Sequence, residues 1–485
     1  MKNKIILLAA FFIFIYSFSA NAQTISGIKM VSGRADTVYR SSHIIVGTAK
    51  PGSEVYINGN KVKQYKTGSF GAEVTLKEGA NQFEIKVKND SEDLKQIYSV
   101  FYKIAQPQQA KIVAADYPDP VVETLPGAYL NYGAGDDRLG GAKISFVSEG
   151  VKMVLLDSVN TLYKVRLSEK SYCYIPKEYV KRTESGTRPP FSLTGSWSVI
   201  NAGKYDKIRI SLEQRQPYTI GFEHDSGRII IDIYGAACNS NWITQYLDVN
   251  AIDYVDFQQK EPDIFRVIVK LKDKYCWGYS VDYQGNALEI SVKHSPKPTL
   301  KGMTIGLDAG HGGSASGAVS PSGYKEKDMN LAMVYMLKAE LEKRGANVVL
   351  SRKDDSDMTM AERKSIFKSA DIDLLISIHC NASGNPLVSG GTSTYYRHIE
   401  YRDLAKTILS RLVTIDGGTK NFGLVGNFNF SLNAPTDYPS VLVETLFLSS
   451  LPDEEKITDP AFQKIFMKTV AKGLEDYLKK VKRAK

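Results

Sequence analysis

The sequence predicts a multidomain chain in which all-β modules precede a C-terminal α/β domain with a mostly parallel central sheet flanked by helices. Three observations support this prediction. The chain has 485 residues, a length that suggests roughly three or four domains. Residues 24–295 contain short apolar runs, alternating or continuous, separated by turns, as expected for β-rich units. From residue 301 onward, buried-strand runs alternate with segments of helical apolar spacing.

Residues 1–22 have the pattern of a secretory signal peptide. Lys2 and Lys4 form the positive end, and Ile5–Phe18 is an apolar core too short to span a bilayer. Ala20-Asn21-Ala22 supplies the small residues of a cleavage site, and no cysteine follows it. No later segment reaches the length of a membrane span. We therefore expect an exported, soluble mature chain that works in the periplasm or cell envelope.

The first module, residues 24–105, reads as an all-β domain. His43–Gly47 and Ile97–Tyr102 alternate or run apolar, and Asn58-Gly59 is a hairpin signal. The stretch resembles immunoglobulin-like sandwich modules, and no residue pattern in it indicates chemistry.

The second module, residues 112–182, contains several short strands. Its ending, Tyr172–Val180, resembles the close of bacterial SH3-like barrels, which often bind cell-wall peptide. Its tyrosines either line a peptide groove or pack within the core and hairpins, and packing is the expectation for any one of them. These residues are Tyr129, Tyr132, Tyr172 and Tyr174.

The third module, residues 191–295, is another β-rich unit. Alternation is clear in Lys207–Leu212 and in Phe265–Leu271. Cys238 and Cys276 lie in this unit, where they either form a disulfide or remain buried free thiols.

The α/β domain, residues 301–480, brings chemical groups to the ends of its predicted strands. Met303–Leu307 is followed by the Gly-rich turn that carries His311, and Glu326 lies in or beside the first turn of a helix. Two further buried strands deliver His379 and Glu444 at their carboxyl ends. In open α/β sheets working groups collect beyond these ends, so the four side chains are expected to converge. Helices are expected at Met329–Lys343, Asp403–Val413 and Phe462–Lys479.

This domain resembles the zinc-dependent N-acetylmuramoyl-L-alanine amidases of bacterial cell-wall turnover. The resemblance runs from about Lys301 to Leu478. It rests on five ordered motifs: DAGHGG at 308–313, EKDMNL at 326–331, LSR at 350–352, SIHCNA at 377–382 and LVETLFLSS at 442–450.

The resemblance implies that His311, Glu326 and His379 bind zinc and that Glu444 is the catalytic acid/base. The chemistry agrees, because a catalytic zinc takes three ligands from His, Asp or Glu and keeps a position for water. No HExxH motif is present, which argues against a thermolysin-type site.

Several neighbouring residues are candidates for supporting roles. Asn381 and Asp308 are expected to orient the imidazoles. Arg352 and Arg363 either contact substrate or brace loops by pairing with nearby aspartates, and we favour bracing. Cys380 follows a ligand on a strand, so its side chain is expected on the opposite face, in the core. The aspartates near Arg352 and Arg363 are Asp354, Asp355 and Asp357.

The predicted function is hydrolysis of the amide bond between N-acetylmuramic acid and the L-alanine of the stem peptide. The third module resembles the AMIN units that target such amidases to the wall. We expect peptidoglycan as partner and no nucleic acid, and the sequence leaves a protein activator open. The net charge of +9 suits an anionic polymer or simply aids solubility, and charge alone does not decide. A wall-binding scaffold without activity and a peptidase acting on other amides are the alternative functions.

Overall fold

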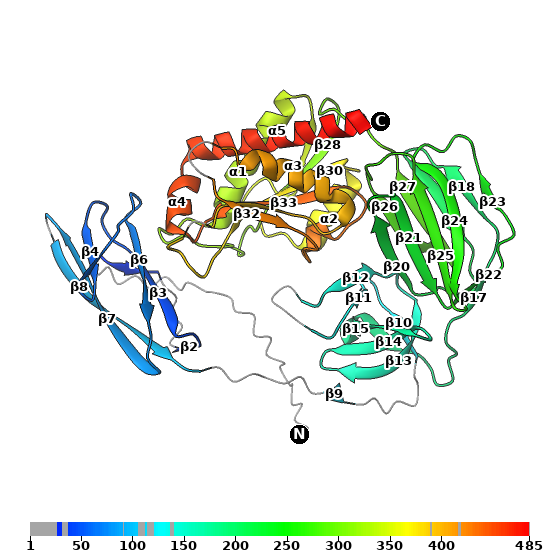
Figure 1. Cartoon of the computed structure of the whole chain (residues 1–485), viewed down its shortest axis with the longest axis horizontal. Coiled ribbons are helices and arrows are strands. Elements are labelled where there is room, and N and C mark those ends of the chain that lie inside the picture. Colours follow the sequence, from blue (N-terminus) through cyan, green and yellow to red (C-terminus); the bar gives the residue numbers. More distant parts are fainter. Residues whose placement is uncertain are drawn as a thin grey trace, which may run out of the picture.

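The computed structural model describes residues 27–31, 37–90, 92–104, 112–113, 121–135, 140–388, 390–415 and 419–484. The predicted signal peptide lies outside these residues. Figure 1 shows strand-rich units leading to an α/β domain that holds the C-terminus. Within the described ranges, no helix combines the length and the apolar character needed to cross a bilayer.

The first β unit consists of two sheets that share one core. The sheet orders are β1-β3-β6 and β2-β8-β7-β4-β5. Ile45, Phe70 and Ile85, which are fully buried, come from both sheets and lie in a single apolar cluster. Its immunoglobulin-like identity stays a prediction. The strands are β1 Lys29–Met30, β2 Thr37–Val38, β3 Ser42–Thr48, β4 Glu54–Ile57, β5 Asn60–Val62, β6 Ser69–Thr75, β7 Gly79–Asn89 and β8 Glu92–Tyr102.

The second β unit forms one sheet in the order β12-β11-β15-β14-β13-β10-β16, with β9 paired to β13. Antiparallel pairing of neighbours and a bulge between Leu155 and Asp157 curve the sheet. Its SH3-like identity also stays a prediction. The elements are β9 Ile112–Val113, β10 Val121–Thr124, β11 Tyr129–Asn131, β12 Lys143–Phe146, β13 Lys152–Val159, β14 Leu162–Ser168, β15 Ser171–Pro176, η1 Lys177–Tyr179 and β16 Val180–Arg182.

The third β unit has sheets in the orders β17-β22, β23-β18-β19-β27-β26 and β20-β21-β25-β24. Its core is continuous with that of the second unit, because Val165 and Ile231 belong to one buried cluster. The AMIN-like assignment stays a prediction. The strands are β17 Ser192–Thr194, β18 Trp197–Asn201, β19 Tyr205–Ile210, β20 Tyr218–Glu223, β21 Arg228–Tyr234, β22 Ala236–Cys238, β23 Ile243–Gln245, β24 Ile252–Glu261, β25 Ile264–Leu271, β26 Tyr279–Gln284 and β27 Ala287–Lys293.

The cysteines are free thiols. All four lie in the described part of the chain, and Cys173, Cys276 and Cys380 are buried. Of the two alternatives left open for Cys238 and Cys276, the structure therefore has the unpaired thiols. Burial raises the pKa of the Cys173 thiol to about 12, which keeps it protonated and unreactive.

The α/β domain is built on a six-stranded sheet in the order β29-β28-β30-β33-β31-β32. β29, β28, β30 and β33 are parallel neighbours, whereas β31 runs antiparallel to β33. The elements are β28 Thr304–Ala309, α1 Glu326–Lys343, β29 Asn347–Leu350, α2 Met360–Ser369, β30 Leu374–Asn381, β31 Thr392–Tyr395, η2 Ile399–Tyr401, α3 Arg402–Leu412, β32 Asn421–Val425, η3 Ser431–Asn433, β33 Ser440–Phe447, α4 Leu451–Ile457 and α5 Pro460–Ala484.

Helices cover both faces of this sheet. Leu374, Ile376 and Ile378 of β30 lie in the same buried cluster as apolar residues of α1, α3 and α5. Leu375, the alternate residue, packs in a second cluster with Phe367 of α2. Because side chains alternate along a strand, β30 must be apolar on both faces, which explains its continuous apolar sequence. Figure 1 shows α5 running along α1 and α3.

The three expected helices are confirmed, with different ends. α1 begins at Glu326, three residues before the predicted start, so Glu326 is its first helical residue. α5 extends to Ala484, because its buried apolar face continues to Val481.

All three β units contact the α/β domain. From the first unit, the Ser69 hydroxyl lies 2.8 Å from that of Ser322. From the second, Lys143 donates to Asn429 at 3.3 Å. From the third, the Tyr279 hydroxyl donates to the buried Glu400 at 2.8 Å.

Candidate active site

His311 lies just beyond the carboxyl end of β28, in a backbone conformation with φ of 61°. This left-handed conformation is uncommon for a residue with a side chain. The turn is held by the guanidinium of Arg363, which donates to the His311 carbonyl at 2.5 Å and to the Ala309 carbonyl at 2.7 Å. The same guanidinium forms a 2.6 Å ion pair with Asp308, and both side chains are at least 98% buried. A buried ion pair therefore fixes the backbone that presents the imidazole.

Glu326 is the first residue of α1, and its side chain turns back toward His311. Three donors besides the imidazoles fix its carboxylate: the backbone N–H of Ala318 at 2.8 Å, that of Cys380 at 3.1 Å and the Asn330 amide at 3.1 Å. The side chain is only 4% exposed. Position at a helix N-terminus also favours a negative charge there.

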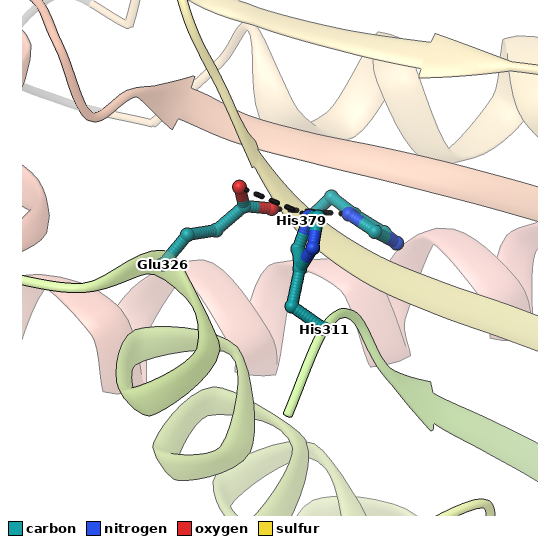
Figure 2. Close-up of side chains that lie close together, drawn as sticks. All are labelled: His311, Glu326 and His379. Atoms are coloured by element: carbon teal, nitrogen blue, oxygen red, sulfur yellow. Dashed lines mark hydrogen bonds and ion pairs between the residues drawn. The ribbon is translucent and has the colours of Figure 1, made fainter. Parts of the chain in front are cut away.

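His379 comes from β30, the strand next to β28 in the sheet. Its Nδ1 lies 3.0 Å from Oε1 of Glu326, and Nε2 of His311 lies 3.2 Å from Oε2 of the same carboxylate. One candidate ligand atom from each of the three residues lies within 4.8 Å of the others. Figure 2 shows both imidazoles directed at the Glu326 carboxylate. The structure thus brings together the three predicted ligands.

The electrostatics of the three side chains favour the ionised form of Glu326 over its protonated form. Burial raises the pKa of Glu326, but hydrogen bonds and charge interactions with His311 and His379 outweigh burial and bring its pKa far below the ordinary value. Glu326 is therefore ionised at neutral pH, as a metal ligand must be.

Two glycines allow this close approach. A Cβ on Gly310 would overlap the His379 ring, and a Cβ on Gly317 would overlap both the Glu326 carboxylate and the His311 ring. Gly317 also has φ of 67°. The Gly-rich sequence around His311 therefore serves to bring backbone against the three side chains.

Glu444 is placed beside this group by the sheet. β33 is parallel to β30, with Glu444 in register with His379. Paired residues of neighbouring parallel strands project from the same face, so Glu444 shares the face of His379. Glu444 is half-buried as a residue, and Oε2 of its carboxylate is buried.

Asp308, Asn381 and Arg352 lie near the group. Asp308 accepts from Arg363 and, at 2.6 Å, from Ser377, and it interacts with the His379 imidazole through charge. The Asn381 amide donates to the Tyr395 hydroxyl at 3.0 Å. That Asp308 and Asn381 orient the imidazoles stays a prediction.

Arg352 braces loops through backbone carbonyl groups, including that of Asp354 at 2.9 Å, and not through an aspartate side chain. It donates to the Ala309 carbonyl at 3.0 Å, the Lys327 carbonyl at 2.7 Å and the Gly310 carbonyl at 3.1 Å. Asp355 pairs with Lys327 instead. Bracing is confirmed, and of the predicted aspartates Asp354 is contacted through its backbone carbonyl.

Sequence reasoning missed Phe430. Its ring lies 5.5 Å from that of His379, nearly perpendicular to it. The residue precedes η3 and has no motif of its own, and only its Phe-Asn-Phe context, residues 428–430, marks it as unusual. It supplies an apolar wall beside the candidate ligand.

The group fits a zinc ion by the chemistry of its donors. Two imidazole nitrogens and one carboxylate are a common catalytic zinc set that leaves a position for water. In addition, Nε2 of His379 is buried and has no hydrogen-bond partner among the described residues. The His311 side chain is 33% exposed, so the group is open to solvent on that side. Fold and site together define an α/β domain with a candidate metal centre at the carboxyl ends of its strands.

Comparison with known proteins identifies the family. The sequence profile of the N-acetylmuramoyl-L-alanine amidases matches residues 305–476. The uncharacterized protein YqiI of Bacillus subtilis (strain 168) is 35% identical over 201 residues, which cover 40% of this chain and 93% of YqiI. The probable cell wall amidase LytH of Staphylococcus aureus is 32% identical over 209 residues, which cover 41% of this chain and 67% of LytH. The chain belongs to the N-acetylmuramoyl-L-alanine amidase family through its C-terminal domain.

A solved structure of an N-acetylmuramoyl-L-alanine amidase is also similar to part of this chain. The crystal structure of the N-acetylmuramoyl-L-alanine amidase from Clostridium difficile 630 is 31% identical, with a TM-score of 0.35, and the match covers 37% of this chain and 98% of that one.

Proposed function

We propose that this chain is a zinc-dependent amidase that hydrolyses the bond between N-acetylmuramic acid and the L-alanine of the stem peptide. The observation that carries the proposal is the convergence of His311, Glu326 and His379 within 4.8 Å, in a domain of the amidase family.

These three residues would hold the zinc ion. When bound, zinc polarises a scissile carbonyl and makes water acidic enough to attack it near neutral pH. The bonds from Ala318, Cys380 and Asn330 fix the Glu326 carboxylate, and Arg363 fixes the turn of His311. The ligands are thus positioned before any ion arrives, which avoids the cost of ordering them on binding.

Glu444 is proposed as the acid/base of the reaction. It lies on the face of His379 and takes a proton from the attacking water, then returns that proton to the leaving amine of L-alanine. Phe430 beside His379 excludes water from one side of the site and strengthens the electrostatic interactions there.

The proposed location and partner follow from the substrate. Peptidoglycan is outside the cytoplasm, so the chain is proposed to be exported, with the predicted signal at residues 1–22. Its β units are proposed to place the amidase domain on the wall, and whether a separate protein activates it is left to experiment.

Mass spectrometry of peptidoglycan digested with the purified chain tests the proposal. Release of stem peptides with a free L-Ala N-terminus is the expected result, and Glu444→Gln should abolish it. Cleavage of crosslinks would instead show a peptidase with another specificity. If a correctly folded, zinc-loaded chain releases no product, the proposed activity is contradicted. The function of a wall-binding scaffold then remains.

A further inference from the structure

Two cationic side chains, Lys143 and Arg397, meet where the second β unit contacts the amidase domain, and Lys364 lies near enough for its charge to act on Lys143. Arg397 follows β31 and is 9% exposed, Lys143 begins β12, and Lys364 lies on α2. Arg397 donates to the Asn429 side-chain oxygen at 2.7 Å, and Lys143 donates to the same oxygen at 3.3 Å. Arg397 also donates to the Lys143 carbonyl at 3.2 Å, so the two chain segments are tied together.

The cluster has no carboxylate counter-charge within the described ranges. Among the residues that the structure describes, no carboxylate forms an ion pair with Lys143, Lys364 or Arg397. The amide oxygen that accepts from two of them is neutral. Burial lowers the pKa of Lys143, and the positive charges of Arg397 and Lys364 lower it further.

The cluster is adjacent to the candidate metal centre. Asn429 lies between Phe428 and Phe430, whose rings are stacked with centroids 5.9 Å apart. Phe430 in turn contacts the ring of His379 at 5.5 Å. Lys364 follows Arg363, the residue that holds the turn of His311. When the scissile bond of an elongated substrate lies at the metal centre, another part of the same substrate would therefore reach the cluster.

We propose that Lys143, Arg397 and Lys364 form a subsite for a carboxylate on the peptide part of the substrate. One buried and two half-buried cations, with no paired carboxylate in the described part of the chain, are costly, and a carboxylate of the substrate would lower that cost while accepting charge-assisted hydrogen bonds. The inference rests on the proposed amidase function and deepens it, because it makes the second β unit part of the substrate site. The peptide selected is one that carries a free carboxylate beyond the scissile amide.

Binding to an inactive chain tests the subsite apart from catalysis. The probe is a soluble N-acetylmuramyl-L-alanyl peptide, prepared with its terminal carboxylate free or amidated, and titrated calorimetrically into zinc-loaded Glu444→Gln protein. We expect the free carboxylate to bind about tenfold more tightly than the amide, the size of one charge-assisted contact, with the preference shrinking as salt rises.

Two further variants in the same background locate the effect. Lys143→Met together with Lys364→Met keeps the aliphatic stems and should reduce the preference to about twofold or less. Lys152→Met, a half-buried strand lysine of the same β unit, is the matched control and should leave the preference intact. Thermal unfolding of each variant verifies that the fold is kept.

Two outcomes would overturn the subsite. One is equal affinity for the free and amidated peptides. The other is a preference for the free carboxylate that persists in the Lys143→Met, Lys364→Met double variant. A loss of this preference that is equally large in the Lys152→Met control counts in the same way. The proposed function has its own readout, because cleavage of the muramyl–alanine bond by the chain with Glu444 intact does not depend on this preference.

Discussion

At the scale of single residues, the candidate site depends on backbone that comes very close to the ligand side chains. Gly310 has no space for a Cβ, because one would overlap the His379 ring. Arg363 contacts both the buried Asp308 and the His311 carbonyl. Its guanidinium therefore neutralises the Asp308 carboxylate and also fixes the backbone of His311.

Gly310→Ala should displace the His379 ring and weaken zinc binding, because the three atoms nearest to the added methyl group all belong to that ring. We expect zinc affinity to fall by about 10–100-fold, the usual cost of disturbing a ligand's support. Competition with a chelator measures it. Gly384→Ala is the matched control, since nothing lies within 4 Å of a Cβ there. Unchanged affinity in Gly310→Ala would mean that His379 is not held by this contact.

Arg363→Met should leave the Asp308 carboxylate buried without its partner. Breaking a buried ion pair from one side costs about 3–5 kcal/mol, so the denaturant midpoint should fall strongly. Adding Asp308→Asn removes the stranded charge and should restore part of the stability. If the single and double variants unfold alike, the ion pair does not carry the stability assigned to it.

At the scale of elements, the sequence predicts most of the α/β domain, since His311 and His379 follow short apolar runs typical of buried strands and Glu326 precedes a run of helical apolar spacing. The predicted placement of His379 and Cys380 on opposite faces of β30 follows from alternation, and Cys380 does lie in the helix-covered core. Long-range partners were not predictable. Arg363 and Asp308 are 55 residues apart, and only the folded sheet brings them together.

The same limit applies to Phe430 and to the cationic cluster. Phe430 reaches His379 only because η3 packs under α2, and nothing in the local sequence fixes that packing. Lys143 and Arg397 come from different units, so their contact exists only in the assembled chain.

α2 offers a prediction at this scale, because a capping box begins it. Thr359 accepts from the N–H of Glu362 at 3.2 Å, and Glu362 accepts from the N–H of Thr359 at 2.7 Å. Thr359→Ala should lower the free energy of unfolding by about 1 kcal/mol, and Thr359→Ser should keep it. Equal loss in both variants in denaturant titrations would show that the cap hydroxyl is not the cause.

At the scale of the whole molecule, the β units are joined to the amidase domain by polar and apolar contacts together. Tyr275 and Trp277 of the third unit pack against Tyr477 of α5. Lys293 of that unit donates to the Ile372 carbonyl at 2.7 Å and pairs with Asp371. We therefore expect the third unit and the amidase domain to unfold together.

Glu400 makes this contact sensitive to pH. Burial raises its pKa to about 7, despite the hydrogen bond from Tyr279. Below about pH 4.5 the carboxyl is protonated in both folded and unfolded chains. As pH rises from there to 7 the unfolded chain loses the proton first, so this group's contribution to stability falls by up to about 3 kcal/mol.

Glu400→Gln should remove that loss, because the amide stays neutral and still accepts from Tyr279. The variant is expected to be more stable than the wild type at pH 8 and about equal at pH 4.5, as measured by denaturant titration. The exposed Glu178→Gln serves as control. A parallel pH dependence of Glu400→Gln and the wild type would contradict the assignment.

The central claim is that His311, Glu326 and His379 share one zinc ion while Glu444 performs proton transfer. Bound-metal content and amidase activity, measured together on the wild type, His311→Ala and Glu444→Ala, test it most directly. The account predicts about one zinc per wild-type chain, loss of both zinc and activity in His311→Ala, and retained zinc without turnover in Glu444→Ala. A wild type that is active without metal, or a His311→Ala variant that keeps its zinc, would contradict it.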